Sequence, residues 1–508
     1  MVAKVWSAVP RGVEALRVQV EVYARSGLPN LTVVGLPDPA MREARERVLA
    51  AIRHLGCQIE TKSIVVNLSP AEERKEGALL DLAIAVGVLM AAGLAPPGSP
   101  EAWLIGELSL DGALRPVRGV LPIVEAATRC GAPVILPADN LSEAAVVRGA
   151  RLYPAATLAD AVAHLRGERP LPETAGGGGR GFAADEGGGF DLADVAGQAH
   201  AKRALEIAAA GGHHLLFLGP PGAGKTMLAQ RLPGILPPLD EAEALATTKV
   251  YSVAPGVPRP QGLITRRPFR APHHTISAAG LVGGGTVPRP GEVSLAHNGV
   301  LFLDEITEFR RDVLEVLRQP MESGLVVIAR AAGSLAFPAS FQLAAAANPC
   351  PCGHLGDPRR ECRCTPPEVR RYRARLSGPL LDRIDLQLEV PAVPYRDLAR
   401  GGAGERSAAV RARVLAARAR QGRRLAGSGR HANAELTPPE VRRWCAPDAE
   451  GERLLELAMN KLALSARALH RILRVARTIA DLDAAETLAA RHVAEAIAYR
   501  TLDRVAAG

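Results

Sequence analysis

The sequence predicts an α/β protein with more than one domain. An apolar run at residues 215–218 leads into a glycine-rich segment and then into a helix-like stretch. Two further apolar runs, residues 300–303 and 342–347, have the length and composition of buried strands in a largely parallel sheet. With 508 residues the chain is too long for a single hydrophobic core, so we expect roughly two to four domains.

The first third of the chain alternates between β-like and helix-like runs. The β-like runs are residues 18–22, 31–34, 63–68 and 134–136, and the clearest helices are residues 41–55 and 81–92. This alternation predicts a mixed α/β or α+β domain over residues 1–170. The longest apolar stretch, residues 82–96, is short for a membrane span and predicts a buried helix.

Glycines gather in residues 175–181 and 187–189, which predicts a flexible linker over residues 171–189. We expect a core domain over residues 190–395 and a helical domain over residues 396–508. The helical runs behind the second expectation are residues 452–464, 466–481 and 491–502. The arginine-laden stretch 407–424 has the composition of a solvated helix face.

The opening residues lack a charged start followed by an apolar core, so no signal peptide is expected. Seven cysteines, four of them clustered, suit a reducing cytosol and do not suggest a disulfide scaffold. We therefore expect a cytoplasmic protein with no membrane partner.

The strongest chemical signal is a glycine-rich loop between a predicted strand and a predicted helix. Its residues are Gly219, Pro220, Pro221, Gly222, Ala223, Gly224, Lys225 and Thr226. Glycines let backbone N–H groups curl around an anion, and the helix start adds its unsatisfied donors. In such a GxxxxGK[ST] loop the lysine reaches the β- and γ-phosphates and the hydroxyl holds Mg²⁺. The loop predicts binding, and with it hydrolysis, of ATP with Mg²⁺.

Two further strands end in polar residues that complete such a site. The run at 300–303 ends in Asp304 and Glu305. This pattern places one carboxylate in the shell of the Mg²⁺ and the next where it polarises an attacking water. The run at 342–347 ends in Asn348, which orients that water or contacts the γ-phosphate, or simply stops the strand as a turn residue.

Five segments together resemble the magnesium-chelatase-like branch of the AAA+ ATPases, and more narrowly its ComM (YifB) family. They are GPPGAGKT at 219–226, LFLDE at 301–305, NPCPCG at 348–353, LLDRID at 380–385, and SARALHRILRVARTIADL at 465–482. The resemblance implies an N-terminal domain like the Lon protease (ribosomal S5 domain 2-like fold), an AAA+ P-loop module and a C-terminal helical lid. It also implies a homohexameric ring with ATP between neighbours. The implied activity is that of a DNA helicase promoting branch migration, and so recombination, in natural transformation.

The same resemblance assigns roles that chemistry alone leaves open. Asn348 matches sensor 1, and Arg383 matches the arginine finger that reaches the γ-phosphate of a neighbouring subunit. A permanently charged planar fork suits that task, although a salt bridge to Asp382 or Asp385 is the simpler alternative. Arg467 matches sensor 2 on the lid, and this assignment rests on the resemblance alone. Residues 197–198 match the adenine-side motif.

Arginines in two insertions are candidate DNA contacts. The resemblance implies a first insertion, near the ring pore, between the phosphate loop and Asp304. It implies a second insertion, a hairpin before sensor 1, which residues 326–330 and 335–341 fit. The candidates are Arg266, Arg267, Arg270, Arg330, Arg359 and Arg360. Arginines grip a phosphate backbone well, but for each one a solvated surface charge is an equal alternative. His273 and His274 lack further ligands at metal spacing, which favours a structural or DNA-contacting role.

Four of the seven cysteines fall within residues 350–364: Cys350, Cys352, Cys362 and Cys364. Four thiolates can close a tetrahedral Zn²⁺ site that leaves no open position, so the predicted zinc is structural. The CxC spacing is tighter than the usual CxxC knuckle, and unliganded reduced thiols are the alternative.

The Lon-like resemblance of the N-terminal domain stops at its catalytic dyad. Leu79 stands where the resemblance requires the catalytic serine, and Leu121 where it requires the lysine. A leucine can neither attack a carbonyl nor accept a proton, so no protease activity is expected.

Charge and composition bear on the partner. The formal net charge of +9 favours a polyanion only modestly, because 62 basic residues largely offset 53 acidic ones. Aromatic residues make up 3% of the chain, too few for a base-stacking platform. The leading hypothesis is an ATP-driven motor on single-stranded or branched DNA. The alternative is a magnesium-chelatase-like motor that remodels a protein partner without DNA.

Overall fold

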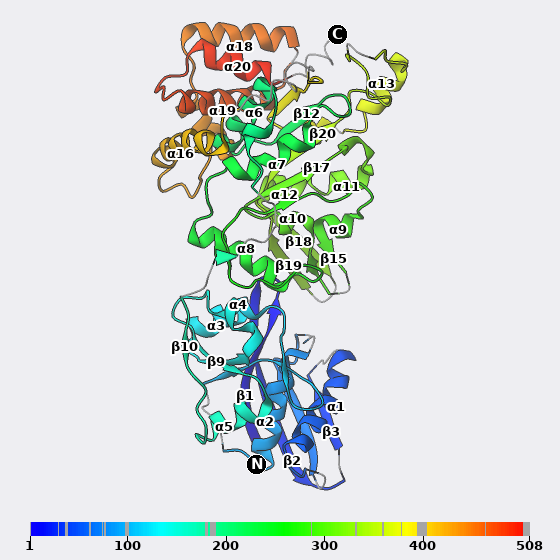
Figure 1. The fold of residues 1–508 in the computed structure, drawn as a ribbon, viewed down its shortest axis with the longest axis vertical. Helices are drawn as coiled ribbons and strands as arrows, with labels where there is room; N and C mark the ends of the chain where they lie inside the picture. Colours follow the sequence, from blue (N-terminus) through cyan, green and yellow to red (C-terminus); the bar gives the residue numbers. More distant parts are fainter. Residues whose placement is uncertain are drawn as a thin grey trace.

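The protein is an elongated molecule in which three parts follow one another along the long axis (Figure 1). In this computed structural model the described residues are 2–28, 30–35, 39–59, 62–73, 75, 78–96, 101–177, 181–182, 189–285, 287–330, 333–357, 360–376, 378–393, 404–462 and 464–500. The N-terminal domain (blue to cyan) occupies one end, the core domain (green) the middle and the C-terminal helices (orange to red) the other end.

The N-terminal domain is built on one mixed sheet. Its strand order is β10-β9-β8-β5-β1-β2-β4-β3. The strands are β1 (Val2–Arg11), β2 (Glu14–Ser26), β3 (Asn30–Val34), β4 (Lys62–Ser69), β5 (Trp103–Leu104), β8 (Val134–Pro137), β9 (Arg151–Ala155) and β10 (Thr174–Ala175). A small separate pair is formed by β6 (Glu107–Leu108) and β7 (Leu114–Arg115). All four predicted β-like runs lie inside observed strands, whereas β1 was not predicted.

Five helices accompany this sheet: α1 (Pro39–His54), α2 (Asp81–Ala91), α3 (Val120–Arg129), α4 (Leu141–Ala144) and α5 (Leu158–Leu165). Every residue of α2 is buried, which explains an apolar run with no polar face. Its one carboxylate, Asp81, is paired with Arg47 of α1 at 2.8 Å. The predicted buried helix is therefore confirmed.

The core domain contains a five-stranded, wholly parallel sheet of order β14-β17-β20-β12-β21. Its strands are β12 (Leu215–Leu218), β14 (Phe269–Arg270), β17 (Val300–Leu303), β20 (Gln342–Ala347) and β21 (Leu386–Glu389). The three predicted strands coincide with β12, β17 and β20. Because the strands are parallel, their carboxyl ends share one edge, and the phosphate loop, Asp304 and Asn348 all follow strands at that edge.

Helices α6 (Ala199–Gly211) and α7 (Lys225–Ile235) belong to the core domain. Between α7 and β17 lie α8 (Glu241–Val253), β13 (Leu263–Ile264), β14, α9 (Ala278–Val282), β15 (Gly283–Gly284), β16 (Arg289–Pro290) and α10 (Glu292–Leu295). After β17 come α11 (Arg311–Glu315) and α12 (Arg318–Ser323). An antiparallel hairpin of β18 (Leu325–Arg330) and β19 (Gly333–Pro338) then precedes β20, where the sequence predicts a hairpin.

The last part of the chain is helical, as predicted. After α13 (Pro366–Arg373) and α14 (Gly378–Leu381) come α16 (Ser407–Arg424), α17 (Pro438–Trp444), α18 (Ala449–Leu462), α19 (Ala466–Leu482) and α20 (Ala490–Ala498). Residues of α6, α7, α16 and α19 share one hydrophobic core with the central sheet. The predicted linker 171–189 is partly structured: β10 pairs with β9, and β11 (Gly181–Phe182) pairs with β13.

The N-terminal domain is docked on the core domain through α8. Arg118 donates to the backbone oxygens of Ala254 at 2.6 Å and Val257 at 2.7 Å. Gly119 N–H donates to Ser252 O at 2.9 Å. The tip of the β1–β2 hairpin reaches the β18–β19 hairpin, since a Cβ added at Gly12 would lie 3.4 Å from Ala336 O. These contacts between the two domains thus lie at α8 and at the β18–β19 hairpin.

Candidate nucleotide site

The phosphate loop connects the buried strand β12 to α7. Gly222 and Gly224 have φ angles of +77° and +87°, a region that favours glycine. Helix α7 starts at Lys225, which directs its first N–H groups into the loop. The loop therefore has the local geometry of an anion cradle.

Lys225 lies at the centre of this cradle. Its Nζ donates to the carbonyl oxygens of Gly219 at 2.6 Å and Pro220 at 3.0 Å, and to Oδ1 of Asn348 at 3.1 Å. Burial lowers the pKa of the Lys225 ammonium from its usual value. A phosphate in the loop would supply the negative charge that these neutral oxygens only partly replace. The ammonium is thus placed for a bound polyphosphate.

The acidic pair lies next to the helix start. Thr226 Oγ1 donates to Asp304 Oδ2 at 2.6 Å, which joins the two side chains predicted to hold Mg²⁺. Glu305 is exposed and has a φ of +48°, a conformation unusual for a residue other than glycine. Its N–H donates to Asp304 Oδ1 at 2.9 Å. The turn thereby separates the half-buried carboxylate of Asp304 from the exposed carboxylate of Glu305.

Gln198 connects the start of the core domain to the same loop. Its backbone is left-handed, with φ +53°, and its Nε2 donates to Ala223 O at 3.3 Å and to Pro391 O at 2.7 Å. The predicted adenine-side residue therefore contacts the phosphate loop and the segment after β21. Together the oxygen and hydroxyl donor set fits Mg²⁺ with a nucleotide triphosphate.

Arg383 lies at the opposite end of the sheet, where the parallel strands begin. It stands three residues before β21, whose Leu386 pairs with Leu215 at the start of β12. It is ion-paired with Glu322 of α12 and donates to Pro379 O at 2.6 Å. Arg383 therefore does form a salt bridge, but its partner is Glu322 and neither Asp382 nor Asp385.

Asp385 belongs instead to a buried cluster that joins the sheet to the lid. Its carboxylate accepts from Arg471 of α19 at 2.8 Å and contacts His213 Nδ1 at 3.2 Å. Burial alone would raise the pKa of Asp385, but Arg471 and His213 hold it below its usual value. Arg467 is exposed one helical turn before Arg471 on the same face of α19.

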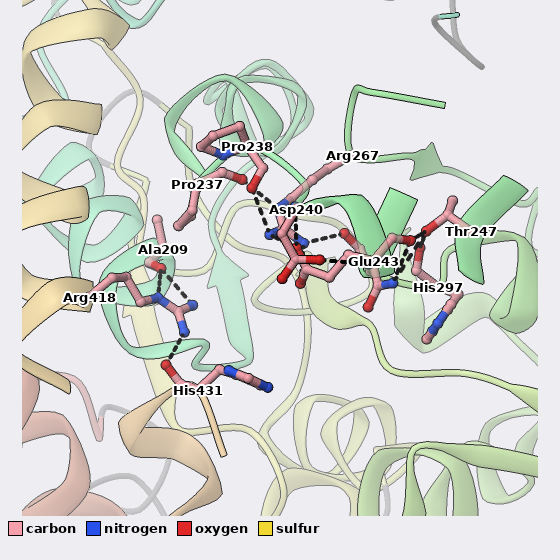
Figure 2. A network of polar contacts seen from close by, with 11 residues as sticks. Ala209, Pro237, Pro238, Asp240, Glu243, Thr247, Arg267, His297, Arg418 and His431 are labelled. Carbon is pink, nitrogen blue, oxygen red and sulfur yellow. Dashed lines mark hydrogen bonds and ion pairs between the residues drawn. The ribbon is translucent and has the colours of Figure 1, made fainter. Parts of the chain in front are cut away.

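The arginines predicted to contact DNA differ in whether they are already paired with a carboxylate. Arg267 makes a bidentate pair with Glu243, with a shortest distance of 2.8 Å, and donates to Pro237 O and Asn298 O (Figure 2). Arg270 makes a bidentate pair with Glu292 at 2.7 and 2.9 Å. These two side chains are occupied within the module and are the least available to a phosphate backbone.

Two candidates are exposed, Arg266 and Arg360. Arg330 ends β18 at the tip of the hairpin, and Arg359 lies outside the described residues. Figure 2 also shows Arg418 of α16, which donates to Ala209 O and His431 O near the Arg267 network. Burial lowers the pKa of Arg418 to about 10. The helix predicted as a solvated face therefore has at least one arginine directed inward.

The four clustered cysteines converge. The sulfurs of Cys350, Cys352, Cys362 and Cys364 all lie within 4.8 Å of one another. Three of the Sγ–Sγ distances are 3.4, 3.7 and 3.7 Å, and a tetrahedral Zn²⁺ with bonds near 2.3 Å requires about 3.8 Å. Backbone N–H groups of His354 and Arg363 lower the pKa of the Cys352 thiol to about 6. This donor set fits a soft divalent metal.

The two leucines predicted to stand at the protease dyad positions are packed in the N-terminal domain. Leu79 and Leu121 are buried in one hydrophobic cluster, and Leu245 of α8 packs against it. The N–H of Leu121 faces Ser252 Oγ at 3.4 Å. Lys75, nearby in sequence, is buried and donates to the backbone oxygen of Pro70. The region is thus a domain contact and not an open cleft.

Some residues of the site carry no sequence signal. Tyr372 of α13 hydrogen-bonds through its hydroxyl to Thr307 Oγ1 at 2.6 Å, just after Glu305. Arg375 contacts Glu308 at 3.1 Å in the same place. These pairs join segments about 65 residues apart, and only a covarying pattern in related sequences could have indicated them.

A parallel sheet with a phosphate loop and an acidic pair at its carboxyl edge defines a P-loop nucleotide-binding protein of the AAA+ type. Family models agree: residues 191–398 match "Magnesium chelatase, subunit ChlI", residues 20–140 match "Subunit ChlI of Mg-chelatase", and residues 404–500 match its C-terminal domain. The chain is 46% identical over 508 residues to the competence protein ComM of Haemophilus influenzae, covering 99% of this chain and 98% of that protein. It is 45% identical over 500 residues to YifB of Escherichia coli, covering 97% and 96%. The chain belongs to the magnesium-chelatase-like ComM family.

A shorter match concerns a protease. Lon protease 2 of Bacillus subtilis is 33% identical over 96 residues, which is 19% of this chain and 17% of that protein. In the part of the chain that the structure describes, no helix has the length and apolar character needed to span a membrane.

Proposed function

We propose that this protein is an ATP-hydrolysing ring motor that moves on DNA and supports recombination in natural transformation, with helicase or branch-migration activity. The observation that carries the proposal is the assembled nucleotide site, in which Lys225 contacts Asn348 and Thr226 contacts Asp304. The near full-length similarity to a protein named for competence supports the biological role. The proposed location is the cytoplasm.

In the proposed mechanism each residue has one task. The loop N–H groups and Lys225 bind the phosphates, and Asn348 holds Lys225 and orients the γ-phosphate or the water. Thr226 and Asp304 would hold Mg²⁺, which neutralises charge on the β- and γ-phosphates. Glu305, exposed at the edge of the site, accepts the proton of the attacking water.

We infer that Arg383, the proposed arginine finger, acts on a neighbouring subunit. The phosphate loop follows the carboxyl end of β12, whereas Arg383 precedes the amino end of the adjacent parallel strand β21. Four residues of strand, roughly 13 Å, separate these two edges. Arg383 therefore lies at the opposite end of the sheet from the phosphate loop of its own chain, which supports a closed ring, most simply a hexamer, with shared sites. Arg467 is proposed to act as sensor 2 of the site.

For the DNA contact we propose Arg266 and Arg360, which are exposed, together with Arg330 at the hairpin tip and Arg359. Arg267 and Arg270 are proposed to hold the insertion in place through Glu243 and Glu292. We also propose that the four clustered cysteines bind one structural Zn²⁺. The N-terminal domain is proposed to have a Lon-like fold without protease activity, because apolar side chains fill the dyad positions.

The second candidate function is remodelling of a protein partner without DNA. It is favoured by the family models, which carry the name of a magnesium chelatase subunit along most of the chain. The two candidates differ in what should stimulate ATP hydrolysis.

The deciding experiment measures ATP hydrolysis with single-stranded, duplex and branched DNA over a salt series. A motor that grips phosphates should be stimulated by DNA and should lose the stimulation as salt rises. Arg266→Ala with Arg360→Ala should reduce it, while Arg310→Ala, at an exposed local ion pair with Asp312, should not. If none of the DNAs stimulates ATP hydrolysis, the result would favour the remodelling function. Sedimentation of the protein in the presence of ATP tests whether the chains assemble into a ring.

A further inference from the structure

The cysteine-rich loop (residues 350–364) starts directly at the nucleotide site. Asn348, whose side chain accepts from Lys225 Nζ at 3.1 Å, precedes Cys350 by two residues. Cys350 is fully buried. A shift of this cysteine therefore moves the chain that positions Asn348.

The cysteine-rich loop also contacts the phosphate loop. A Cβ added at Gly353 would lie 2.7 Å from Cδ and 3.0 Å from Cγ of Pro221. Gly353 itself has φ +82° and donates its N–H to Cys350 O at 3.0 Å. The turn from Cys350 to Gly353 is therefore in contact with the phosphate loop at Gly353, where there is room only for a hydrogen atom.

The other end of the loop reaches the acidic half of the site. After Cys364 the chain enters α13, where Tyr372 hydrogen-bonds to Thr307 at 2.6 Å. Arg373 of the same helix donates to Pro349 O at 3.2 Å, which ties α13 back to the residue after Asn348. The loop is thus anchored on both nucleotide-binding segments that a bound Mg–ATP would join.

We propose that the metal ion held by the four cysteines and the nucleotide held by residues 219–226 stabilise each other's binding. The inference rests on the proposed ATP and zinc sites and adds a coupling between them. A closed four-thiolate site fixes the turn at Gly353 and the start of α13. That turn limits the positions open to Pro221, and α13 limits those open to Thr307. Linkage then requires that nucleotide binding tightens the hold on the metal by the same factor.

The first test measures zinc transfer from the full-length protein to a chromophoric chelator, with and without Mg²⁺ and a non-hydrolysable ATP analogue. We expect the analogue to slow zinc release at least about fivefold, within the range typical of coupled sites. Lys225→Ala, which removes the phosphate-binding ammonium, should abolish the slowing without changing the zinc content.

The second test uses two glycines of the same loop as a matched pair. Gly353 and Gly356 have nearly equal φ angles of +82° and +80°, but a Cβ at Gly356 meets nothing within 4 Å among the described residues. Gly353→Ala should weaken binding of a fluorescent ATP analogue at least about fivefold with one zinc per chain retained. Gly356→Ala bears the same backbone strain and should bind the analogue like the wild type.

A rescue identifies the contact. Pro221→Ala removes both ring atoms that a Cβ at position 353 would meet. In the Gly353→Ala background it should restore affinity toward that of Pro221→Ala alone. Equal effects of the two glycine variants, or absence of rescue, would overturn the proposed path through Pro221.

The failures are distinguishable. No zinc in the wild-type protein would overturn the metal site and this coupling with it, while leaving ATP binding to be measured separately. If the protein holds one zinc per chain and nucleotide does not change the rate of zinc release, the coupling is overturned. Both proposed sites then remain intact. Absence of analogue binding to the wild type would overturn the ATP site itself.

Discussion

Lys225 Nζ donates to Oδ1 of Asn348 at 3.1 Å across 123 residues of sequence. This bond joins the phosphate loop to the end of the neighbouring strand β20. Hydrogen bonds to a charged group are worth about 1.5–3 kcal/mol. Asn348→Ala should therefore lower kcat roughly 10- to 100-fold. Titration with a fluorescent ATP analogue should show affinity changed much less. A selective loss of affinity with normal kcat would contradict a role in hydrolysis.

Glu305 is the proposed base. Glu305→Gln keeps the shape and the left-handed turn but cannot accept the proton, so hydrolysis should fall roughly 10²- to 10⁴-fold. ATP binding should persist, because Thr226 and Asp304 still meet at 2.6 Å. Steady-state hydrolysis and analogue binding on the same preparation check both parts. Normal turnover would show that another residue activates the water.

Arg383 tests whether the site is shared between chains. Arg383→Ala should reduce hydrolysis by about 10³-fold or more while ATP still binds. Lys225→Ala should be inactive for the opposite reason. Because each variant retains the half of the site that the other lacks, mixed rings should regain measurable activity. A mixture as inactive as its two components would argue that Arg383 acts within its own chain or only structurally.

Glu143 gives a prediction for pH. It is buried at the domain contact, where Ser252 Oγ and Asn140 Nδ2 donate to it and Arg118 and Arg259 lie nearby. Burial raises the pKa of Glu143 to about 7 from a usual 4.5. The folded protein then binds more protons than the unfolded chain between these values, so stability falls as pH rises through this window. The loss approaches about 3 kcal/mol above pH 7.

Glu143→Gln supplies a neutral group at all pH values and should remove this dependence. Comparing melting temperatures of the two proteins from pH 5 to pH 8 checks it, since the variant should gain on the wild type as pH rises. A gap between the two that is constant with pH would mean that Glu143 is already ionised in the folded protein.

The parts of the site that lie close together in sequence could be predicted from sequence. A buried strand, a glycine-rich turn and a helix start are local features, and they locate Lys225 and Thr226 without any structure. Helix α2 could be predicted equally well, since an apolar run without a polar face has to be buried.

The parts that depend on distant partners could not be predicted in this way. The charge of Arg267 and Arg270 suggested DNA contacts, and nothing in their local sequence indicated Glu243 or Glu292 as partners. Strand β1 was missed although its burial partly alternates, because a lysine and small residues weaken the apolar pattern. The contact of α8 with the N-terminal domain likewise depends on tertiary packing, which local pattern does not encode.

The opposite positions of Arg383 and the phosphate loop on one parallel sheet have a further consequence. If Arg383 is the arginine finger proposed above, a single chain would bind ATP but would lack the positive charge that stabilises the transition state of hydrolysis. Specific activity should then climb steeply with protein concentration before levelling off. For the proposed ring, dilution would switch hydrolysis off, and any scaffold that gathers the chains would switch it on.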